Sequence, residues 1–417
     1  MRMVKLTAAV ERQLLSARQG RDAEAERAAA RIISDVRRRG DAALAAWTKR
    51  LDGIDLRASG LWIGKREMRR AAATVSAEFR RALEHAARNV RRVAERQMPR
   101  AWSEEVEPGV RVEQMVRPIE AIGCYIPGGR HALVSTLVMT VAPAKVAGVE
   151  RIVVACPKPS TEVLAAAWWL GGVSVARIGG AQAIAALAYG TKSVPRVEKI
   201  FGPGNRYVTA AKQLVSADCA IDLPAGPTEA IVLSRRGNPR WIAADLIAQA
   251  EHAPDAGSFL VTTSKRLAEE VRAEVSAQLA GLQKSNPARA SLEKTGAIVL
   301  AETWNQAWEF VNRFGAEHLS VPDENGKEAG RCRAAGTVFA GGWAAQPLGD
   351  YASGSNHVLP TGGWARRRGG LSAADFVKCM SVQRIGREGF QRLAEDVQTL
   401  ARAEGLEGHA QAVSVRR

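Results

Sequence analysis

The sequence predicts an α/β protein with two Rossmann-like, doubly wound halves, a helical N-terminal region and a helical C-terminal tail. From about residue 118, short β-branched runs alternate with alanine-rich segments of helical length, which is typical of βαβ units around a parallel sheet. This alternation occurs twice, before and after the stretch 222–229. Between about residues 8 and 105, apolar side chains recur at helical spacing with charges between them.

The chain has 417 residues, enough for several structural units. We expect a helical N-terminal region over 1–105, a first Rossmann-like unit over 106–229, a second over 230–365 and a C-terminal tail over 366–417. From about residue 350 we expect a glycine-rich loop and then helix. The expected strands are Ala121–Ile126, Arg151–Ala155, Ser174–Ile178, Ala230–Leu233, Ser258–Val261, Ala297–Leu300 and Thr337–Ala340.

Composition argues against several classes of protein. The net charge of +16 comes mostly from arginines spread over amphipathic helices, which favours a solvated basic surface that attracts anionic ligands over a nucleic-acid groove. The sequence contains no run of about 18 apolar residues, so it predicts no membrane-spanning helix. The five cysteines are scattered without a C-x-x-C pair, which predicts no disulfide framework and fits a reducing cytoplasm. Cys124 is either a nucleophile or a small buried residue.

Three glycine-rich turns occur, at 125–129, 179–182 and 201–205, and the first two directly follow expected strands. Each could bring backbone N–H groups close to a phosphate or a ribose. None is a full G-x-G-x-x-G fingerprint, because Asn205, Arg206 and Tyr207 follow Gly204. Plain turn geometry therefore stays open beside nucleotide binding.

Polar residues in the second half form a candidate site. Gln249 and His252 are three apart and share a helix face, which suits a metal pair or a histidine at a helix end. Glu317 and His318 are adjacent and diverge, which suits two acid–base tasks or two solvated loop residues. We expect these groups in loops at the carboxyl ends of strands, where open α/β sheets bind ligands.

The loop from Asp350 to His357 could add a cation ligand and a pocket-lining side chain, or be polar only because it is a loop. His409 stands alone near the C-terminus, where a histidine is usually exposed. From the residues alone, a Gln/His/Asp/His metal site in an α/β enzyme stays one possibility.

Nearly the whole chain resembles the histidinol dehydrogenase family. The resemblance rests on strings that occur in one order: CYIPGG, IGGAQAIAALAYGT, KIFGPGNRYVTAAK, DLPAGPTEA, DLIAQAEH, GAEHLSV, GDYASGSNHVLPT, GLSAADF and EGLEGHAQAV. It implies oxidation of L-histidinol through L-histidinal to L-histidine with two NAD, by a cytoplasmic enzyme of histidine biosynthesis.

The resemblance also implies specific site residues. Zinc, one ion per subunit, would be held by Gln249, His252, Asp350 and by His409 from the other subunit of a homodimer. NAD would contact Tyr125, Gln182 and Asn205. Histidinol would contact Thr228, Gln249, His252, His318, Asp350, Glu404 and His409. His318 would act as the base in both oxidations, and Glu317 would activate water.

The chain departs from the family pattern at three places. Thr228 stands where serine is frequent, Arg366, Arg367 and Arg368 make their segment more basic, and the stretch 344–347 differs. These departures bear on substrate fit and dimer detail. Two alternatives remain: a related zinc- and NAD-dependent dehydrogenase of another primary alcohol such as a sulfonated diol, and a basic binding protein without catalysis.

Overall fold

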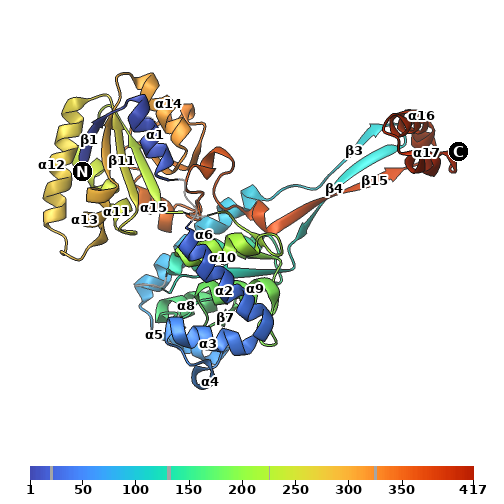
Figure 1. The fold of residues 1–417 in the computed structure, drawn as a ribbon, viewed down its shortest axis with the longest axis horizontal. Helices are drawn as coiled ribbons and strands as arrows, with labels where there is room; N and C mark the ends of the chain where they lie inside the picture. Colours follow the sequence, from blue (N-terminus) through green and yellow to red (C-terminus); the bar gives the residue numbers. More distant parts are fainter. Residues whose placement is uncertain (19–21, 129–132, 225, 324–325) are drawn as a thin grey trace.

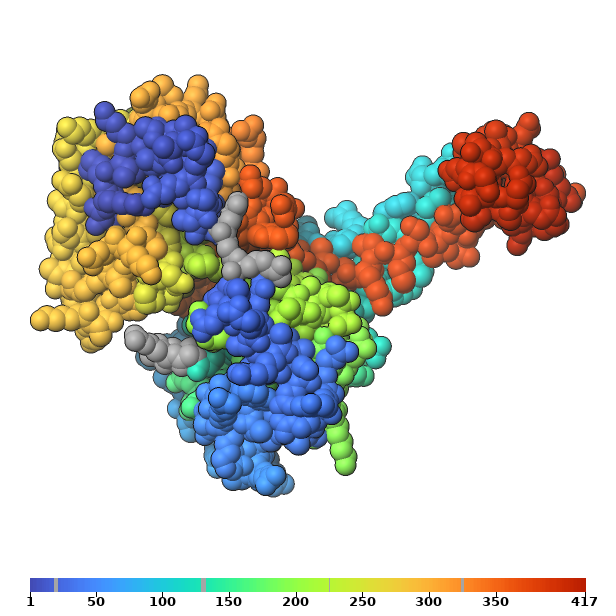
Figure 2. All heavy atoms as spheres, in the orientation of Figure 1, coloured from blue at the N-terminus to red at the C-terminus, as the bar shows by residue number. Residues whose placement is uncertain are grey.

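The computed structural model describes residues 1–18, 22–128, 133–224, 226–323 and 326–417. It confirms the predicted α/β class: two six-stranded, mostly parallel sheets are each covered by helices, and a three-stranded antiparallel sheet forms a separate arm. Figures 1 and 2 show two lobes in contact and the arm extending away from them with the C-terminus at its tip.

The first sheet has the order β2-β7-β6-β5-β8-β9. From β5 the chain winds to β6 and β7 on one side and then returns to β8 on the other, which is the switch point of a doubly wound sheet. Only the pair formed by β2 and β7 is antiparallel among the described strands of this sheet. Its strands are β2 (Trp62–Ile63), β5 (Ala121–Tyr125), β6 (Arg151–Ala155), β7 (Ser174–Ala176), β8 (Lys199–Phe201) and β9 (Ala220–Ile221).

The second sheet has the order β1-β12-β11-β10-β13-β14 and its pairs are parallel. It winds in the same way, from β10 to β11 and β12, then back to β13 and β14 on the other side of β10. Apart from the edge strands, β2 being antiparallel to its neighbour and β1 parallel, the two halves have the same topology, which fits a duplication. The strands of the second sheet are β1 (Arg2–Lys5), β10 (Glu229–Leu233), β11 (Gly257–Thr262), β12 (Ala297–Leu300), β13 (Ala316–Val321) and β14 (Ala335–Ala340).

Each sheet is buried on both faces. In β10, Ile231 and Leu233 enter one apolar cluster, whereas Val232 between them enters another, as the two-residue period of a strand requires. Around the first sheet lie α2 (Ala23–Arg39), α3 (Asp41–Asp52), α4 (Leu56–Ser59), α5 (Lys65–Thr74), α6 (Ala77–Gln97), α7 (Val134–Val146), α8 (Thr161–Trp169), α9 (Gly180–Tyr189) and α10 (Arg206–Val215). With the second lie α1 (Ala8–Ser16), α11 (Pro239–Ala250), α12 (Lys265–Ala280), α13 (Pro287–Lys294), α14 (Trp304–Phe314) and α15 (Gln346–Tyr351).

The arm combines strands from two distant parts of the chain. The strands β3 (Trp102–Glu107) and β15 (Val377–Ile385) flank β4 (Val110–Pro118) in antiparallel register. The helices α16 (Arg387–Ala403) and α17 (Glu407–Ser414) cap its far end (Figure 1). Apolar side chains remain exposed there, including Leu400 at 64% and Val415 at 66%.

Several strands were not expected from the sequence. All six residues of β3 are exposed, so no alternation of buried and exposed side chains marks it as a strand. The segment after residue 350 contains β15 as well as the expected loop and helix. Of the helices in the described residues, none has both the length and the apolar character needed to cross a bilayer.

Candidate functional site

Three of the predicted site residues meet where β10 and β13 begin. Thr228 directly precedes β10, while Glu317 and His318 are the second and third residues of β13. The two strands are neighbours, with Ala230 opposite His318. The expectation of a loop at the carboxyl ends is therefore wrong for this sheet: the pair lies on a strand, at its amino end.

Glu317 is buried at 7% exposure and is held by β10. Its Oε2 accepts a hydrogen bond from the Thr228 hydroxyl and another, at 3.0 Å, from the Glu229 amide. Burial raises the pKa of Glu317 above its usual value, against the opposing effect of the charge on His318. The carboxylate is thus fixed in position and is a stronger base than an exposed one.

His318 lies between two carboxylates. Its Nδ1 is 3.8 Å from Oε2 of Glu317, and its Nε2 is 3.5 Å from Oδ1 of Asp350. Burial alone would lower the pKa of His318, but the two carboxylates outweigh it and raise the pKa. Neither ring nitrogen has a hydrogen-bond partner within the described residues. Both nitrogens are therefore free to exchange a proton with a ligand.

The end of α11 brings two predicted metal ligands to the same place. The Gln249 side chain donates to the Thr228 hydroxyl at 2.8 Å, and its Oε1 accepts from Gln346 at 2.6 Å. His252 follows the helix, with Nδ1 3.1 Å from the Gln249 carbonyl oxygen, which leaves Nε2 without a protein partner in the described part of the chain. This arrangement orients Nε2 as metal-binding histidines are oriented.

Asp350, near the end of α15, completes the side chains that meet here. The charges on His318 and His252 help to lower the pKa of Asp350, although burial opposes them. The Asp350 carbonyl oxygen lies 2.8 Å from His357 Nδ1, and Nε2 of His357 lies 3.2 Å from the Thr136 hydroxyl on α7. The cluster therefore lies where the two lobes meet.

The structure does not bring the last two predicted residues to this cluster. Glu404 follows α16 and His409 is in α17, both exposed, at the tip of the arm (Figures 1 and 2). Within the described residues of one chain, no three His, Cys, Asp or Glu side chains are arranged to hold a metal ion. The predicted ligands that meet within one chain are Gln249, His252 and Asp350, one fewer than the four of a tetrahedral zinc site.

The predicted NAD contacts lie at the carboxyl ends of the first sheet. Tyr125 ends β5, and its hydroxyl accepts from the Gly180 amide at 3.1 Å. Asn205 follows β8 and caps α10, accepting from the Tyr207 and Val208 amides. The two therefore flank the switch point between β5 and β8, where doubly wound sheets bind nucleotides. Gly129, which ends the predicted turn at 125–129, lies outside the described residues.

Gln182 in α9 has a buried side-chain oxygen that no described residue hydrogen-bonds. Its Nε2 donates to Asp52 at 2.9 Å, while its fully buried Oε1 has no hydrogen-bond partner among the described residues. Buried polar atoms are normally satisfied, so this oxygen is available to a ligand or a water. Asp52 itself was not singled out from the sequence.

A buried ion pair fixes the loop between β8 and Asn205. Lys212 contacts the Asp222 carboxylate and donates to the Gly202 carbonyl at 2.8 Å, while the Gly202 amide donates to Asp222 at 2.7 Å. Gly202 has a φ of 108°, and an added Cβ would lie 2.2 Å from the Tyr125 carbonyl oxygen. Only glycine fits this turn.

The basic departure at 366–368 has a structural use. Arg368 donates to the Asp222 carbonyl and pairs with Asp375 at 3.0 Å. Arg367 stacks over Trp364, 4.6 Å from the ring centroid. Arg368 therefore connects the C-terminal segment to the buried pair behind the Gly202 turn.

Asp245 lies one turn before Gln249 and has no ion pair or hydrogen bond in the described part of the chain. Burial raises the pKa of Asp245 from 3.8 to about 6. The folded state then binds this proton more tightly than the unfolded state, so stability falls as the pH rises from about 4 to about 6. Asp245→Asn should raise the free energy of unfolding at about pH 8 by about 1 kcal/mol, and near pH 4.5 by about a third as much. Urea unfolding at both pH values checks this; an equal change at both would contradict it.

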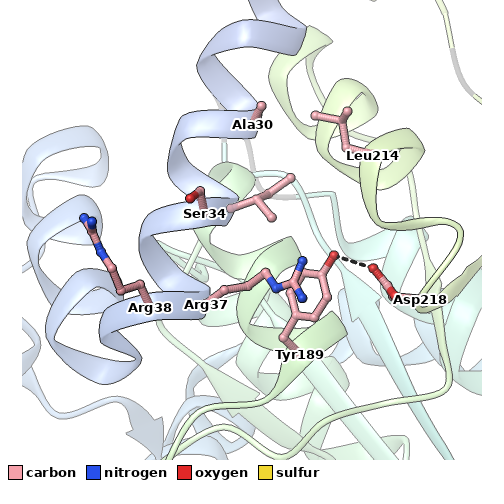
Figure 3. Close-up of a pocket in the computed structure, with 8 residues that line it drawn as sticks. Ala30, Ser34, Arg37, Arg38, Tyr189, Leu214 and Asp218 are labelled. Carbon is pink, nitrogen blue, oxygen red and sulfur yellow. Dashed lines mark hydrogen bonds between the residues drawn. The ribbon is translucent and has the colours of Figure 1, made fainter.

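A pocket of about 500 Å³ on the first lobe is separate from this cluster. In Figure 3, Arg37 of α2 lies against the Tyr189 ring, and the Tyr189 hydroxyl donates to Asp218. None of the predicted site residues lines this pocket. Its polar groups connect α2 to α9 and to Asp218, just after α10, and we assign the pocket no part in the chemistry.

Comparison with known proteins identifies the family. The family model described as histidinol dehydrogenase matches residues 15–417. Histidinol dehydrogenase from Geobacillus kaustophilus is 45% identical over 401 residues, covering 94% of each chain. Its counterpart from Vibrio parahaemolyticus is 44% identical over 395 residues, covering 93% of this chain and 91% of that protein.

The fold agrees with that result. A crystal structure of histidinol dehydrogenase from Elizabethkingia anophelis matches with a TM-score of 0.94 and 34% identity, covering 100% of this chain and 98% of that one. The agreement extends over both sheets and the arm. The chain belongs to the histidinol dehydrogenase family and is an oxidoreductase.

Proposed function

We propose that this protein oxidises L-histidinol through L-histidinal to L-histidine with two molecules of NAD. The observation that carries the proposal is the buried pair of Glu317 and His318 beside Gln249, His252 and Asp350, in a chain of this family. A four-electron oxidation needs a base for the alcohol and an activated water for the aldehyde. The pair supplies one group for each.

The donor chemistry around Asp350 fits zinc. Gln249 offers an amide oxygen, His252 a ring nitrogen without a partner among the described residues, and Asp350 a carboxylate whose pKa is lowered. Zinc accepts nitrogen and oxygen ligands of these types. When bound, it would anchor the amino alcohol through the imidazole and amine nitrogens.

The two acid–base residues would then act in turn. His318 accepts the hydroxyl proton while the carbinol carbon loses a hydride, giving the aldehyde. Glu317 takes a proton from water as the water oxygen adds to the aldehyde carbon. Protonated His318 gives its proton to the carbonyl oxygen, which forms a gem-diol and leaves His318 neutral. His318 accepts a proton from the diol as the second hydride leaves, giving the acid. NAD supplies the hydride acceptor in both oxidations, and we assign its contacts to Tyr125, Gln182 and Asn205.

We further propose a homodimer in which the arm of each chain completes the site of the other. His409 would be the fourth zinc ligand and Glu404 a substrate contact. The exposed apolar side chains at the arm tip support this, since Val397, Leu400, Leu406 and Val415 need a surface to cover them. The free cysteines in the described residues support a cytoplasmic location.

NADH release from L-histidinol, before and after chelation, tests the proposal. We expect two NADH per histidinol, loss of activity with the chelator and recovery with zinc. Turnover of another primary alcohol, but not histidinol, by folded and zinc-loaded enzyme would favour the related dehydrogenase. Salt-sensitive nucleic-acid binding without turnover of any alcohol would favour the binding protein.

A further inference from the structure

A buried arginine connects the N-terminal segment to the strands that hold Glu317. Arg18 forms a two-pronged ion pair with the Glu229 carboxylate, with Nε 2.6 Å from Oε2. It also donates to the Phe314 carbonyl at 2.6 Å, and its guanidinium lies 3.5 Å from the Phe314 ring centroid. Arg18 and Glu229 are 211 residues apart, so no sequence pattern connects them.

The contacts of Arg18 lie where the two neighbouring strands β10 and β13 begin, and β13 carries Glu317. Glu229 is the first residue of β10, and its amide donates to Oε2 of Glu317. Phe314 ends α14, two residues before β13 begins and three before Glu317. The Arg18 guanidinium thus holds Glu229, whose amide hydrogen-bonds the Glu317 carboxylate. It also holds the turn that leads into β13.

The electrostatics make this arginine necessary. Glu229 is 4% exposed and Glu317 is 7% exposed, so two buried carboxylates are neighbours. Each raises the free energy of the other's charged form, and Arg18 is the cation that contacts Glu229 in the described part of the chain. Without it, the Glu229 carboxylate would have no counter-ion in the described part of the chain, so it would either take up a proton or draw the start of β10 towards solvent.

We propose that Arg18 is a positioning residue for Glu317, acting through Glu229 and the Phe314 carbonyl to hold the carboxylate where water attacks the aldehyde. This rests on the proposed function of Glu317. It assigns to the segment before α2 a part in the second half of the reaction. A displacement of the order of 1 Å at a reacting group can cost about a hundredfold in rate.

The test compares Arg18→Gln and Arg18→Lys with a matched control. Arg313 also forms a two-pronged pair, with Glu11 of α1, but it is half-exposed and contacts no site residue in the described chain. We expect Arg18→Gln to slow histidinal oxidation about ten- to a hundredfold, with a smaller effect on the first hydride transfer and on the KM for NAD. The rate of histidinal oxidation by Arg18→Lys should lie between those of the wild type and Arg18→Gln, because lysine keeps the charge but not the planar guanidinium. Arg313→Gln should match the wild type.

A rescue experiment separates positioning from general destabilisation. Guanidinium added at concentrations far below those that unfold the protein should partly restore histidinal oxidation by Arg18→Ala. Equal slowing of both half-reactions, or wild-type rates with only a lower melting temperature, would overturn the inference. If Arg18→Gln does not fold, the Arg18→Lys rates decide by the same criteria. Wild-type enzyme that does not oxidise histidinol would instead refute the proposed function.

Discussion

Glu317→Gln is expected to convert the four-electron oxidation into a two-electron one, with histidinal as the product. The amide oxygen of glutamine can still accept from the Thr228 hydroxyl and the Glu229 amide, so the side chain should keep its place. What it loses is the ability to take a proton from water. We expect histidinal oxidation to fall by about a hundred- to ten-thousandfold, with NAD affinity unchanged. The measurement is NADH per histidinol, expected to drop from two towards one.

A control for this substitution is Glu328→Gln. Glu328 accepts from the indole groups of Trp304 and Trp308, so it is also a hydrogen-bonded carboxylate, but it lies outside the catalytic cluster. It should keep two NADH per histidinol. A Glu317→Gln enzyme that still forms histidine at the wild-type rate, or that loses only NAD affinity, would contradict the role of Glu317 in activating water.

The sequence predicts seven of the twelve strands described in the two six-stranded sheets, because most of these seven are apolar on both faces. Segments such as Arg151–Ala155 and Ala297–Leu300 are short β-branched runs between helices. The strand β13 was missed for a physical reason: it reads AEHLSV, and polar side chains in a fully buried strand conceal the apolar pattern. The arm strands were missed because β3 has no buried face and β15 is mostly exposed.

The site could be predicted only in part. The spacing of Gln249 and His252 predicts that they share a helix face. The adjacency of Glu317 and His318 favours two separate acid–base roles. Spacing could not show that β10 and β13 would be neighbours, because that depends on the return of the chain across the sheet. Nor could it show the contacts of Arg18 with Glu229, or the distance of His409 from the cluster.

Because His409 lies far from the cluster of its own chain, we expect two inactive variants to restore activity when they are mixed. His409→Ala should lose zinc and activity, because the proposed fourth ligand is gone. Glu317→Gln should make almost no histidine. If the arm of one chain completes the site of the other, a mixed dimer has one site with an intact Glu317 from the first chain and an intact His409 from the second. Random pairing makes about half of the dimers mixed with one complete site each, so about a quarter of wild-type histidine formation should return.

The opposite outcome is equally clear, because a site built within one chain would contain a fault in every subunit of the mixture. Mixing the two variants would then restore nothing, however well the chains exchange. A His409→Ala enzyme with normal zinc content and rate would remove His409 from the site altogether. The exposed position of α17 makes the shared site the expected result: within one chain, the cluster has Gln249, His252 and Asp350, and the remaining predicted ligand lies at the tip of the arm.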